Sequence, residues 1–331
     1  PDLSATSYAV AQDGCRIAFR VWRPSTTDST PGTPLVLVQG WMKVKEDWAG
    51  LDRALCKRIR APVVIFDNRG IGESDVPDGP YTIPLFVADL KAVVEQALGK
   101  APVDLMGISM GGCIVQMAAL SNLFPVRRIV LGCTTPGGPE TKAGPGLVSC
   151  MQLVEEASRM PSENVNPREL VTDLQYHNLP SSWIEAHPDI FEQYIVDQLR
   201  YPRPLKGLVG QMRALAKFNV SRTLPSLSIP ILVLHGDEDV VIPIDAAHLL
   251  SQKLPHADLC VLEGAGHLFW ITHLHDAVRA TASFLNRIIT PDSKSHSLQA
   301  FRTLQPTLQP IRTSPTASSS KASSKALRAK L

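Results

Sequence analysis

The 331-residue chain carries 33 Lys and Arg against 31 Asp and Glu, and 44% of its residues are hydrophobic. This composition is typical of a globular protein with enough apolar material for a core. The net charge of +2 excludes the strongly basic balance of a nucleic-acid-binding protein. The longest apolar runs, such as 229–234, are far shorter than the about 20 residues that cross a bilayer, so we expect no transmembrane helix.

The first 136 residues alternate between predicted strands and predicted helices. Residues 7–22 alternate in polarity about Asp13-Gly14, which predicts a β-hairpin. A continuous apolar run, which is typical of a buried parallel strand, lies at 34–40, and further strands are predicted at 61–70, 103–107 and 127–133. Apolar spacing of three and four predicts helices at 47–60, 84–98 and 109–121. The order indicates an α/β fold with a mostly parallel, doubly wound sheet that begins with an antiparallel hairpin.

The alternation stops near residue 136 and resumes near residue 224. Between these points, 137–223 shows helical periodicity broken by prolines and no run typical of a buried strand. Strands at 229–236 and 257–264 then alternate with helices at 245–254 and 275–288. We expect residues 1–136 and 224–290 to form one α/β core, and 137–223 to form a helical lid over the end of the sheet where such folds bind ligands.

The last segment, 291–331, differs from the rest in composition. It holds seven basic residues and one acid, for a charge of +6, whereas residues 1–290 hold 26 basic and 30 acidic residues, for a charge of −4. Its Ser, Thr, Pro and Gln content predicts disorder. The final Ala329-Lys330-Leu331 resembles the small–basic–Leu peroxisomal address. We therefore expect a peroxisomal protein that binds the import receptor through this tripeptide, with the cytoplasm as the alternative location.

The six cysteines indicate free thiols rather than disulfides. Cys133 and Cys260 lie in or beside strand-like apolar runs, and Cys113 lies in an apolar helical segment. Free cysteine often packs as a small core residue. The chain contains no C-x-x-C pair for zinc or redox chemistry. We expect six reduced thiols in an intracellular compartment.

The strongest catalytic signal is Gly107-Ile108-Ser109-Met110-Gly111, which follows a predicted strand and precedes a predicted helix. A sharp strand-to-helix turn lifts a serine hydroxyl out of a sheet, and its tightness requires neighbours without a Cβ. The helix N-terminus behind Ser109 offers unpaired N–H groups for a developing oxyanion. We predict that Ser109 is a nucleophile.

A nucleophilic serine needs a general base and a carboxylate that orients the base. His267 follows the strand at 257–264 in a Gly-rich loop, and Asp239 follows the strand that ends at Gly236. Both loops leave the same edge of the predicted sheet as Ser109. Asp237 is the rival acid, but the spacing of Asp239 to Pro243 favours Asp239.

With these residues, the chain resembles the α/β-hydrolase superfamily over residues 7–290, in its serine-nucleophile, lid-containing branch. The segment 67–74 (DNRGIGES) is similar to the family's D-x-R-G-x-G-x-S loop. The resemblance implies Ser109 as nucleophile, His267 as base and Asp239 as orienting acid. It also implies an oxyanion hole formed by the backbone N–H groups of Trp41 and Met110. Gln39 stands where the family usually has His, and we expect this to change loop packing rather than remove activity.

The resulting expectation is a serine hydrolase that cleaves an ester or thioester, lipid-like or acyl, without a cofactor. Serine in place of aspartate at position 109 argues against halide- or epoxide-opening chemistry. The alternatives are acyl transfer, lactone hydrolysis or carbon–carbon bond hydrolysis by the same residues, and a non-catalytic receptor for a small molecule.

Other chemistry-bearing residues have structural interpretations. His273 and His275, two apart at a helix start, do not face one metal site, and we predict no metal. Gly70-x-Gly72 lacks the rest of a dinucleotide fingerprint. The remaining histidines, His235 among them, are expected at surface, capping or tail positions. The lid aromatics and Phe269-Trp270 are expected to pack, with some lining an apolar acyl pocket whose substrate-binding residues the sequence does not identify.

Overall fold

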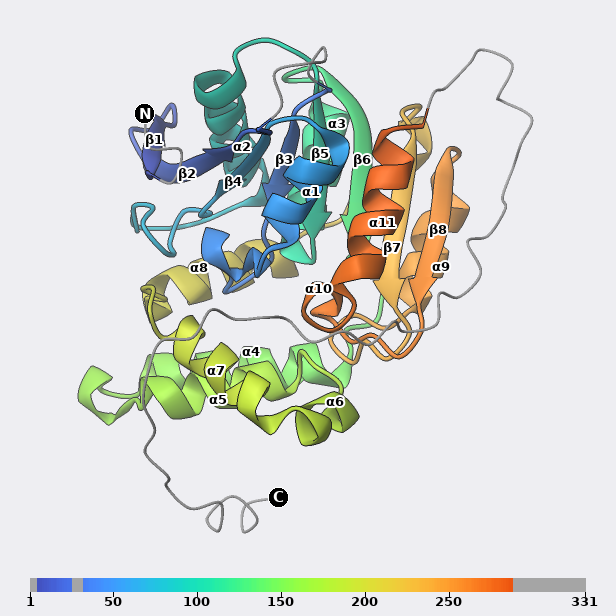
Figure 1. The fold of residues 1–331 in the computed structure, drawn as a ribbon. Coiled ribbons are helices and arrows are strands. Elements are labelled where there is room, and N and C mark those ends of the chain that lie inside the picture. Colours follow the sequence, from blue (N-terminus) through green and yellow to red (C-terminus); the bar gives the residue numbers. More distant parts are fainter. Residues whose placement is uncertain (1–4, 26–31, 288–331) are drawn as a thin grey trace.

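The computed structural model of the chain describes residues 5–25 and 32–287, and its centre is one eight-stranded sheet (Figure 1). The strands lie in the order β1-β2-β4-β3-β5-β6-β7-β8. Their bounds are β1 Ser7–Val10, β2 Arg16–Trp22, β3 Leu35–Val38, β4 Val63–Phe66, β5 Val103–Ile108, β6 Val126–Gly132, β7 Ile231–Gly236 and β8 Ala257–Leu262. β2 pairs antiparallel with β1 and β4, and every later pairing is parallel.

The predicted N-terminal hairpin is confirmed, and its turn chemistry explains it. Gly14 has φ +84°, a conformation that glycine adopts without steric cost. Its N–H donates to the Ala11 carbonyl at 2.9 Å, while the Asp13 carboxylate accepts from the Cys15 N–H at 3.2 Å. These bonds fix the register in which Ser7 faces Phe19.

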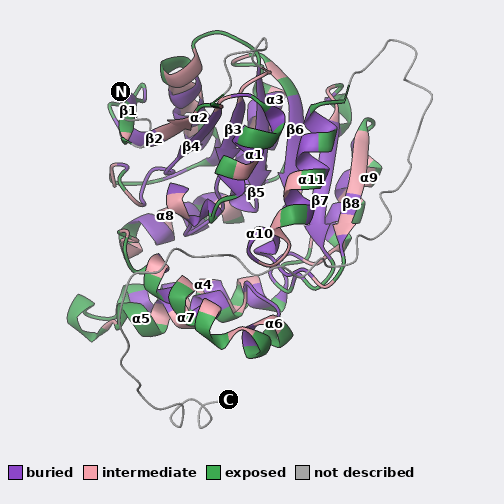
Figure 2. Cartoon of the chain, viewed as in Figure 1, coloured by how far each residue is buried: buried purple, intermediate pink, exposed green. Residues whose placement is uncertain are grey.

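Helices cover both faces of the sheet, so the parallel strands are buried on both sides (Figure 2). Successive strand residues alternate between two apolar clusters: Val36 and Leu105 point to one face, whereas Leu35 and Met106 point to the other. The core helices are α1 Leu51–Ile59, α2 Ile83–Leu98, α3 Met110–Ser121, α9 Asp245–Lys253, α10 Phe269–Thr272 and α11 Leu274–Leu285. Members of α2, α3 and α9 belong to the first cluster, and members of α1 and α11 to the second.

Between β6 and β7 the described chain forms five α-helices and no sheet strand, as the proline-broken periodicity predicts. We call these helices the helical insert. They are α4 Pro145–Arg159, α5 Pro167–Tyr176, α6 Ser181–Ala186, α7 Pro188–Gln198 and α8 Leu205–Ala216, with short 3₁₀ turns at Ser162–Asn164 and Leu224–Ser226. The insert lies beyond the end of the sheet at which the parallel strands finish (Figure 1).

Several predicted helices differ in detail from the observed ones; the helix expected at 275–288, for example, is α11 at Leu274–Leu285. The helix expected at 47–60 is a 3₁₀ turn at Lys45–Trp48 followed by α1. The break falls at Ala49 and Gly50, both with positive φ. The helix expected to start at Ser109 starts one residue later, because Ser109 has φ +55° and is its N-cap.

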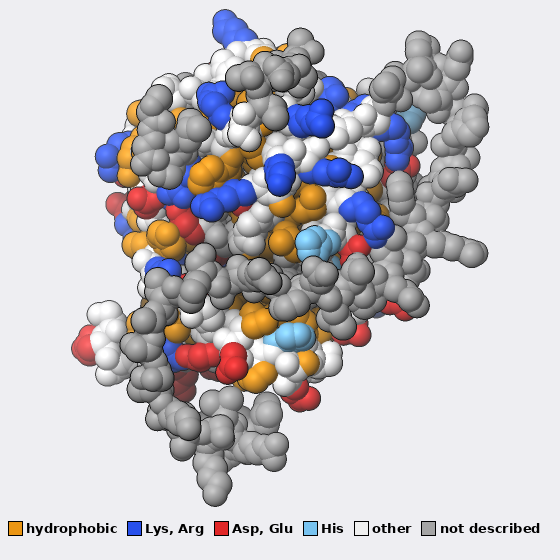
Figure 3. Space-filling model, viewed as in Figure 1, with side chains coloured by type: hydrophobic (Ala, Val, Ile, Leu, Met, Phe, Trp, Pro, Cys, Tyr) orange, Lys and Arg blue, Asp and Glu red, His pale blue; other side chains and the backbone are white. Residues whose placement is uncertain are grey.

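Charge is unevenly spread on the face seen in Figure 3, where Lys and Arg side chains lie over α1 and acidic side chains are frequent on the helical insert. No helix in the described ranges is long and apolar enough to span a membrane. The expected disordered tail and its terminal tripeptide, Ala329-Lys330-Leu331, lie outside the described residues.

Candidate active site

Ser109 lies at the sharp turn between β5 and α3. Its backbone angles, φ +55° and ψ −120°, are unfavourable for a residue with a Cβ. Two hydrogen bonds from the end of β6 hold it there: the Ser109 N–H donates to the Gly132 carbonyl at 2.9 Å, and the Thr134 hydroxyl donates to the Ser109 carbonyl at 2.7 Å. The strained serine is therefore fixed by the neighbouring strand as well as by its own helix.

The glycines around Ser109 are required by close backbone approach. A Cβ on Gly107 would overlap the Gly111 carbonyl, and a Cβ on Gly111 would overlap the Val38 carbonyl of β3. Gly40 also lies against the serine, since a Cβ there would come within 3.0 Å of the Ser109 Cβ. The turn is thus packed between β3 and its own helix, as the Gly-x-Ser-x-Gly pattern predicts.

Asp239 and His267 meet across two loops that leave β7 and β8. The His267 Nδ1 lies 2.7 Å from the Asp239 Oδ2, and both residues are buried. The other carboxylate oxygen accepts the N–H groups of Val241 and Ile242 at 2.8 and 2.9 Å. These bonds fix the direction in which the carboxylate faces the imidazole ring.

The surroundings of Asp239 favour its ionised form. Burial alone would raise the pKa of this carboxyl, but the charge and hydrogen bonds of His267 and His235 hold the pKa well below its usual range. Asp239 is therefore a carboxylate that is hydrogen-bonded to the His267 ring. The rival, Asp237, instead accepts the Gly264 N–H at 2.7 Å and is exposed.

The expectation that His235 is a surface, capping or tail residue is wrong. It lies in β7, is fully buried, and its Nε2 is 2.8 Å from the Ile242 carbonyl and 3.4 Å from the Asp239 carboxylate. It braces the Asp239 loop from the sheet side. Its place at the end of an otherwise apolar strand was the signal in the sequence, because a polar ring buried there needs a partner.

Ser109 and His267 line one narrow cavity beneath the helical insert. Within the described part of the chain, the serine hydroxyl makes no direct hydrogen bond to the imidazole, and such bonds often tighten only when substrate binds. The cavity is mainly apolar, and its walls include Ile108, Leu147, Cys150, Leu215, Val241, Leu268 and Trp270. Trp270 is the one residue of the expected aromatic set among these walls.

The loop after β3 forms another wall of this cavity through Gly40, Trp41 and Met42. The helical insert holds this loop in place: the Trp41 indole donates to the Leu208 carbonyl at 2.9 Å, and the Met42 N–H donates to the Gln211 side-chain oxygen at 3.3 Å. Among the described residues, no backbone or side-chain acceptor takes the backbone N–H groups of Trp41 and Met110. Both are therefore free to donate to a ligand.

The family model for the alpha/beta hydrolase fold matches residues 33–274. The chain belongs to this family. A pimeloyl-[acyl-carrier protein] methyl ester esterase of Aliivibrio fischeri is 26% identical over 261 residues, which cover 77% of the chain and 95% of that protein. The 3-oxoadipate enol-lactonase 2 of Acinetobacter baylyi is 30% identical over 208 residues, which cover 62% of the chain and 72% of that protein.

Solved structures share the fold of this alpha/beta hydrolase. A hydrolase from Pseudomonas aeruginosa has a TM-score of 0.72 at 23% identity and covers 86% of this chain and all of its own. An esterase from Thermogutta terrifontis has a TM-score of 0.70 at 22% identity, with coverage of 85% of this chain and 98% of its own. At these identities the likeness establishes the fold alone.

Gln39 is buried in this hydrolase chain, at the end of β3. Its side-chain oxygen lies 3.3 Å from the Gly40 N–H, and its side-chain nitrogen has no partner among the described residues. Its backbone carbonyl accepts from the Asn68 amide at 3.0 Å. Gln39 thus contacts the loop that carries Gly40 and Trp41 without contributing a side chain to the cavity wall.

The segment 67–74 is a structural loop, as the sequence indicates. The Asp67 carboxylate accepts from the Lys45 N–H at 2.6 Å and from its ammonium at 2.9 Å. A Cβ on Gly72 would overlap this carboxylate. Arg69, buried, binds Asp89 at 2.5 and 2.6 Å and Asp13 at 2.7 Å. These contacts join the loop to the hairpin and to α2.

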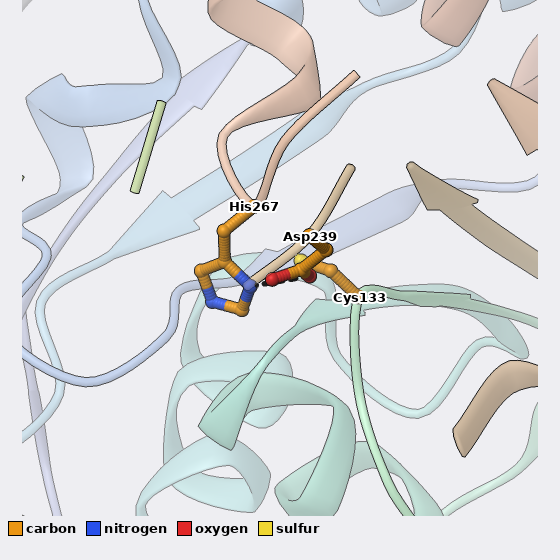
Figure 4. A group of neighbouring side chains, drawn as sticks. All are labelled: Cys133, Asp239 and His267. Carbon is orange, nitrogen blue, oxygen red and sulfur yellow. Dashed lines mark hydrogen bonds and ion pairs between the residues drawn. The ribbon is translucent and has the colours of Figure 1, made fainter. Parts of the chain in front are cut away.

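One side-chain group near the site could hold a metal ion by position alone. Potential ligand atoms of Cys133, Asp239 and His267 lie within 4.8 Å of one another (Figure 4). However, the Asp239 oxygens already accept from His267 and two backbone amides, and burial raises the pKa of the Cys133 thiol well above its usual value. The Asp239 carboxylate is thus already engaged in hydrogen bonds, and Cys133 is its neutral neighbour.

The sequence did not predict a group of buried and half-buried polar residues between the loop after β3 and the helical insert. Lys43 and Asp47 come from the loop and its 3₁₀ turn, and Gln175, Tyr194, Gln198 and Arg203 come from the insert. No motif connects these positions along the chain, because their proximity depends on how the insert folds back over the sheet.

Proposed function

We propose that this alpha/beta hydrolase is a serine hydrolase that cleaves a carboxylic ester or thioester through an acyl-enzyme. The observation that carries the proposal is the Asp239–His267 hydrogen bond at the cavity that also holds the strained Ser109. A nucleophile, a base and a fixed carboxylate converging on one apolar cavity match the requirements of nucleophilic acyl transfer.

In the proposed first step, His267 Nε2 takes the Ser109 hydroxyl proton while the serine oxygen forms a bond to the substrate carbonyl carbon. Asp239 holds Nδ1–H and stabilises the imidazolium. The free N–H groups of Trp41 and Met110 donate to the oxyanion, and the positive end of α3 lies behind it. The intermediate collapses as His267 returns the proton to the departing alcohol or thiol.

In the second step, water attacks the acyl-serine ester with His267 again as base, and the acid product leaves with Ser109 restored. The mainly apolar walls favour an acyl chain over a polar group near Ser109. The relatives named above are a methyl ester esterase and an enol-lactonase, so their printed activities are also ester cleavage. Lactone hydrolysis by this chain would use the same steps.

The proposal is tested by Ser109→Ala with p-nitrophenyl butyrate as substrate. We expect turnover to fall to the buffer rate, because no other described hydroxyl lies beside His267 in this cavity. Ser121→Ala, at an exposed position of the same helix, is the matched control and should keep full activity. Retained turnover in Ser109→Ala would refute the nucleophile assignment. Product analysis with added alcohols would separate hydrolysis from acyl transfer.

The location stays a prediction from the sequence. Ala329-Lys330-Leu331 resembles a peroxisomal address, and if it acts as one, the natural substrates are those of that compartment, such as fatty acyl esters or acyl thioesters.

A further inference from the structure

Lys43 is a buried lysine in the wall of the cavity that holds Ser109. It follows Trp41 by two residues in the loop after β3, and only 3% of its surface is exposed. It lines the same cavity as Ser109 and His267. A lysine in such a place is unusual, because a buried charge requires compensation.

The partners of the Lys43 ammonium are uncharged oxygens from the helical insert. It donates to the Gln175 side-chain oxygen and to the Tyr194 hydroxyl, each at 2.7 Å. Its third contact, to the Gln198 side-chain oxygen, is longer at 3.3 Å, and that oxygen also accepts from Arg203 at 3.3 Å. Two of the three ammonium N–H groups thus make short hydrogen bonds, and the third makes a long, weak one.

No carboxylate among the described residues forms an ion pair with Lys43. The carboxylate with the largest electrostatic effect on Lys43 is Asp47. Its oxygens already accept hydrogen bonds from Arg203 at 2.8 and 3.0 Å, from the Gln198 amide at 2.6 Å and from the Val44 N–H at 2.9 Å. The positive charge of Lys43 is therefore solvated by neutral dipoles and lacks a dedicated counter-ion.

The other ionisable groups around Lys43 do not supply negative charge. Burial raises the pKa of the Cys150 thiol to about 12 and that of the Tyr194 phenol well above its usual value, so both are neutral. Arg203 adds a second positive charge nearby. Burial, with Arg203, lowers the pKa of Lys43 to about 7, although Asp47 opposes this. An anion bound in the cavity would stabilise the charged form of Lys43, which burial disfavours.

We propose that Lys43 binds a carboxylate carried on the acyl part of the substrate, which makes this chain an esterase for half-esters of dicarboxylic acids or similar acyl groups with a free acid. The inference rests on the proposed function, since it places the acid group relative to an ester carbonyl at Ser109. A carboxylate oxygen would replace the weak Gln198 contact and accept a charge-assisted hydrogen bond.

The structure favours a carboxylate over a larger anion. One ammonium with one weakly held N–H matches a single carboxylate oxygen, while Arg203, the neighbouring cation, is committed to Asp47 and to backbone carbonyls. The mainly apolar walls of this cavity suit a methylene chain joining the two ends of such a substrate.

The test compares mono-p-nitrophenyl adipate with its methyl-capped form, methyl p-nitrophenyl adipate, which differ by one charge. At pH 6 we expect kcat/KM to be at least about tenfold higher for the acid. This ratio should fall as the pH rises through about 7, where Lys43 loses its charge while the substrate carboxylate stays ionised. The ionisation of His267 affects both substrates equally and cancels in the ratio.

Lys43→Met keeps the length and shape of the side chain and removes the charge. We expect the ratio to fall to about one or below in this variant, whatever its absolute rates. Lys91→Met, on the exposed face of α2, is the control and should keep the wild-type ratio. A Lys43→Met enzyme in which both substrates slow equally and the ratio persists would overturn the proposal and show that Lys43 only fastens the insert to the loop.

Calorimetry on Ser109→Ala separates this proposal from the proposed function, because binding needs no turnover. Monomethyl adipate should bind at least about tenfold more tightly than dimethyl adipate, and the added Lys43→Met change should abolish the difference. Equal binding of the two probes to Ser109→Ala would overturn the carboxylate site even if ester hydrolysis is confirmed. A carboxylate preference without hydrolysis by the wild type would overturn the function alone.

Discussion

Replacing Asp239 by Asn tests whether the acid orients His267 or only supports its loop. Asn can still accept the N–H groups of Val241 and Ile242 through its oxygen, so the loop keeps the bonds that now measure 2.8 and 2.9 Å. The side that faced His267 becomes an NH₂ group, which cannot accept the Nδ1 proton across the present 2.7 Å. The ring then favours the tautomer with its proton on Nε2, which cannot accept a proton from Ser109.

The expected loss is large because the correct tautomer and the stabilised imidazolium disappear together. We expect kcat for p-nitrophenyl butyrate to fall about 10⁴-fold, or about 5.5 kcal/mol in activation free energy. KM and the thermal midpoint should change little, since the cavity walls and loop bonds persist. Steady-state kinetics and thermal denaturation measure these quantities.

Asp237→Asn is the matched control two residues away. Its carboxylate contacts the Gly264 N–H and not the imidazole, so its activity should stay within about threefold of wild type. The reasoning would be refuted if Asp239→Asn kept more than about a tenth of wild-type kcat, or if Asp237→Asn caused the larger loss.

Three further changes test other parts of the account. Arg69→Met should lower the free energy of unfolding by about 3–5 kcal/mol in urea denaturation, because it leaves the buried Asp89 uncompensated; a loss below about 1 kcal/mol would contradict this. Burial depresses the Lys43 pKa to about 7, below its value near 10.4 in the unfolded chain. The unfolded chain therefore binds more protons between these values, and the wild type should gain stability relative to Lys43→Met as the pH rises from 7 to 10. If the stability of the wild type relative to Lys43→Met stayed constant or fell over this pH range, the ammonium of Lys43 would not be destabilised by burial. Deleting residues 329–331 should move a fluorescent fusion from peroxisomal puncta to the cytosol, and unchanged puncta would refute the address.

The sheet and the Ser109 turn were predictable because their signals are local. Strands that are buried on both faces appear as continuous apolar runs, and the turn at Ser109 requires glycines at fixed positions along the chain. Asp239 and His267 could be placed at one sheet edge because each follows a parallel strand. In the structure, the His267 Nδ1 and the Asp239 Oδ2 lie 2.7 Å apart.

The missed residues depend on long-range packing. Lys43 appears in the sequence as an ordinary loop lysine, and its burial depends on Gln175 and Tyr194, more than 130 residues away. His235 was misassigned although it follows four apolar residues of a buried strand, because the sequence does not show the Ile242 carbonyl that its ring contacts. The break at Ala49-Gly50 was missed because the residues on either side share helical periodicity, and the positive φ values come from the turn.

The most direct test of the central claim is covalent labelling of the native enzyme with a fluorophosphonate, followed by peptide mass spectrometry. The account predicts one label per chain, on Ser109, with labelling abolished in Ser109→Ala and strongly slowed in Asp239→Asn. A label on another residue, or labelling that persists in Ser109→Ala, would contradict the assignment of Ser109, His267 and Asp239 as the catalytic group.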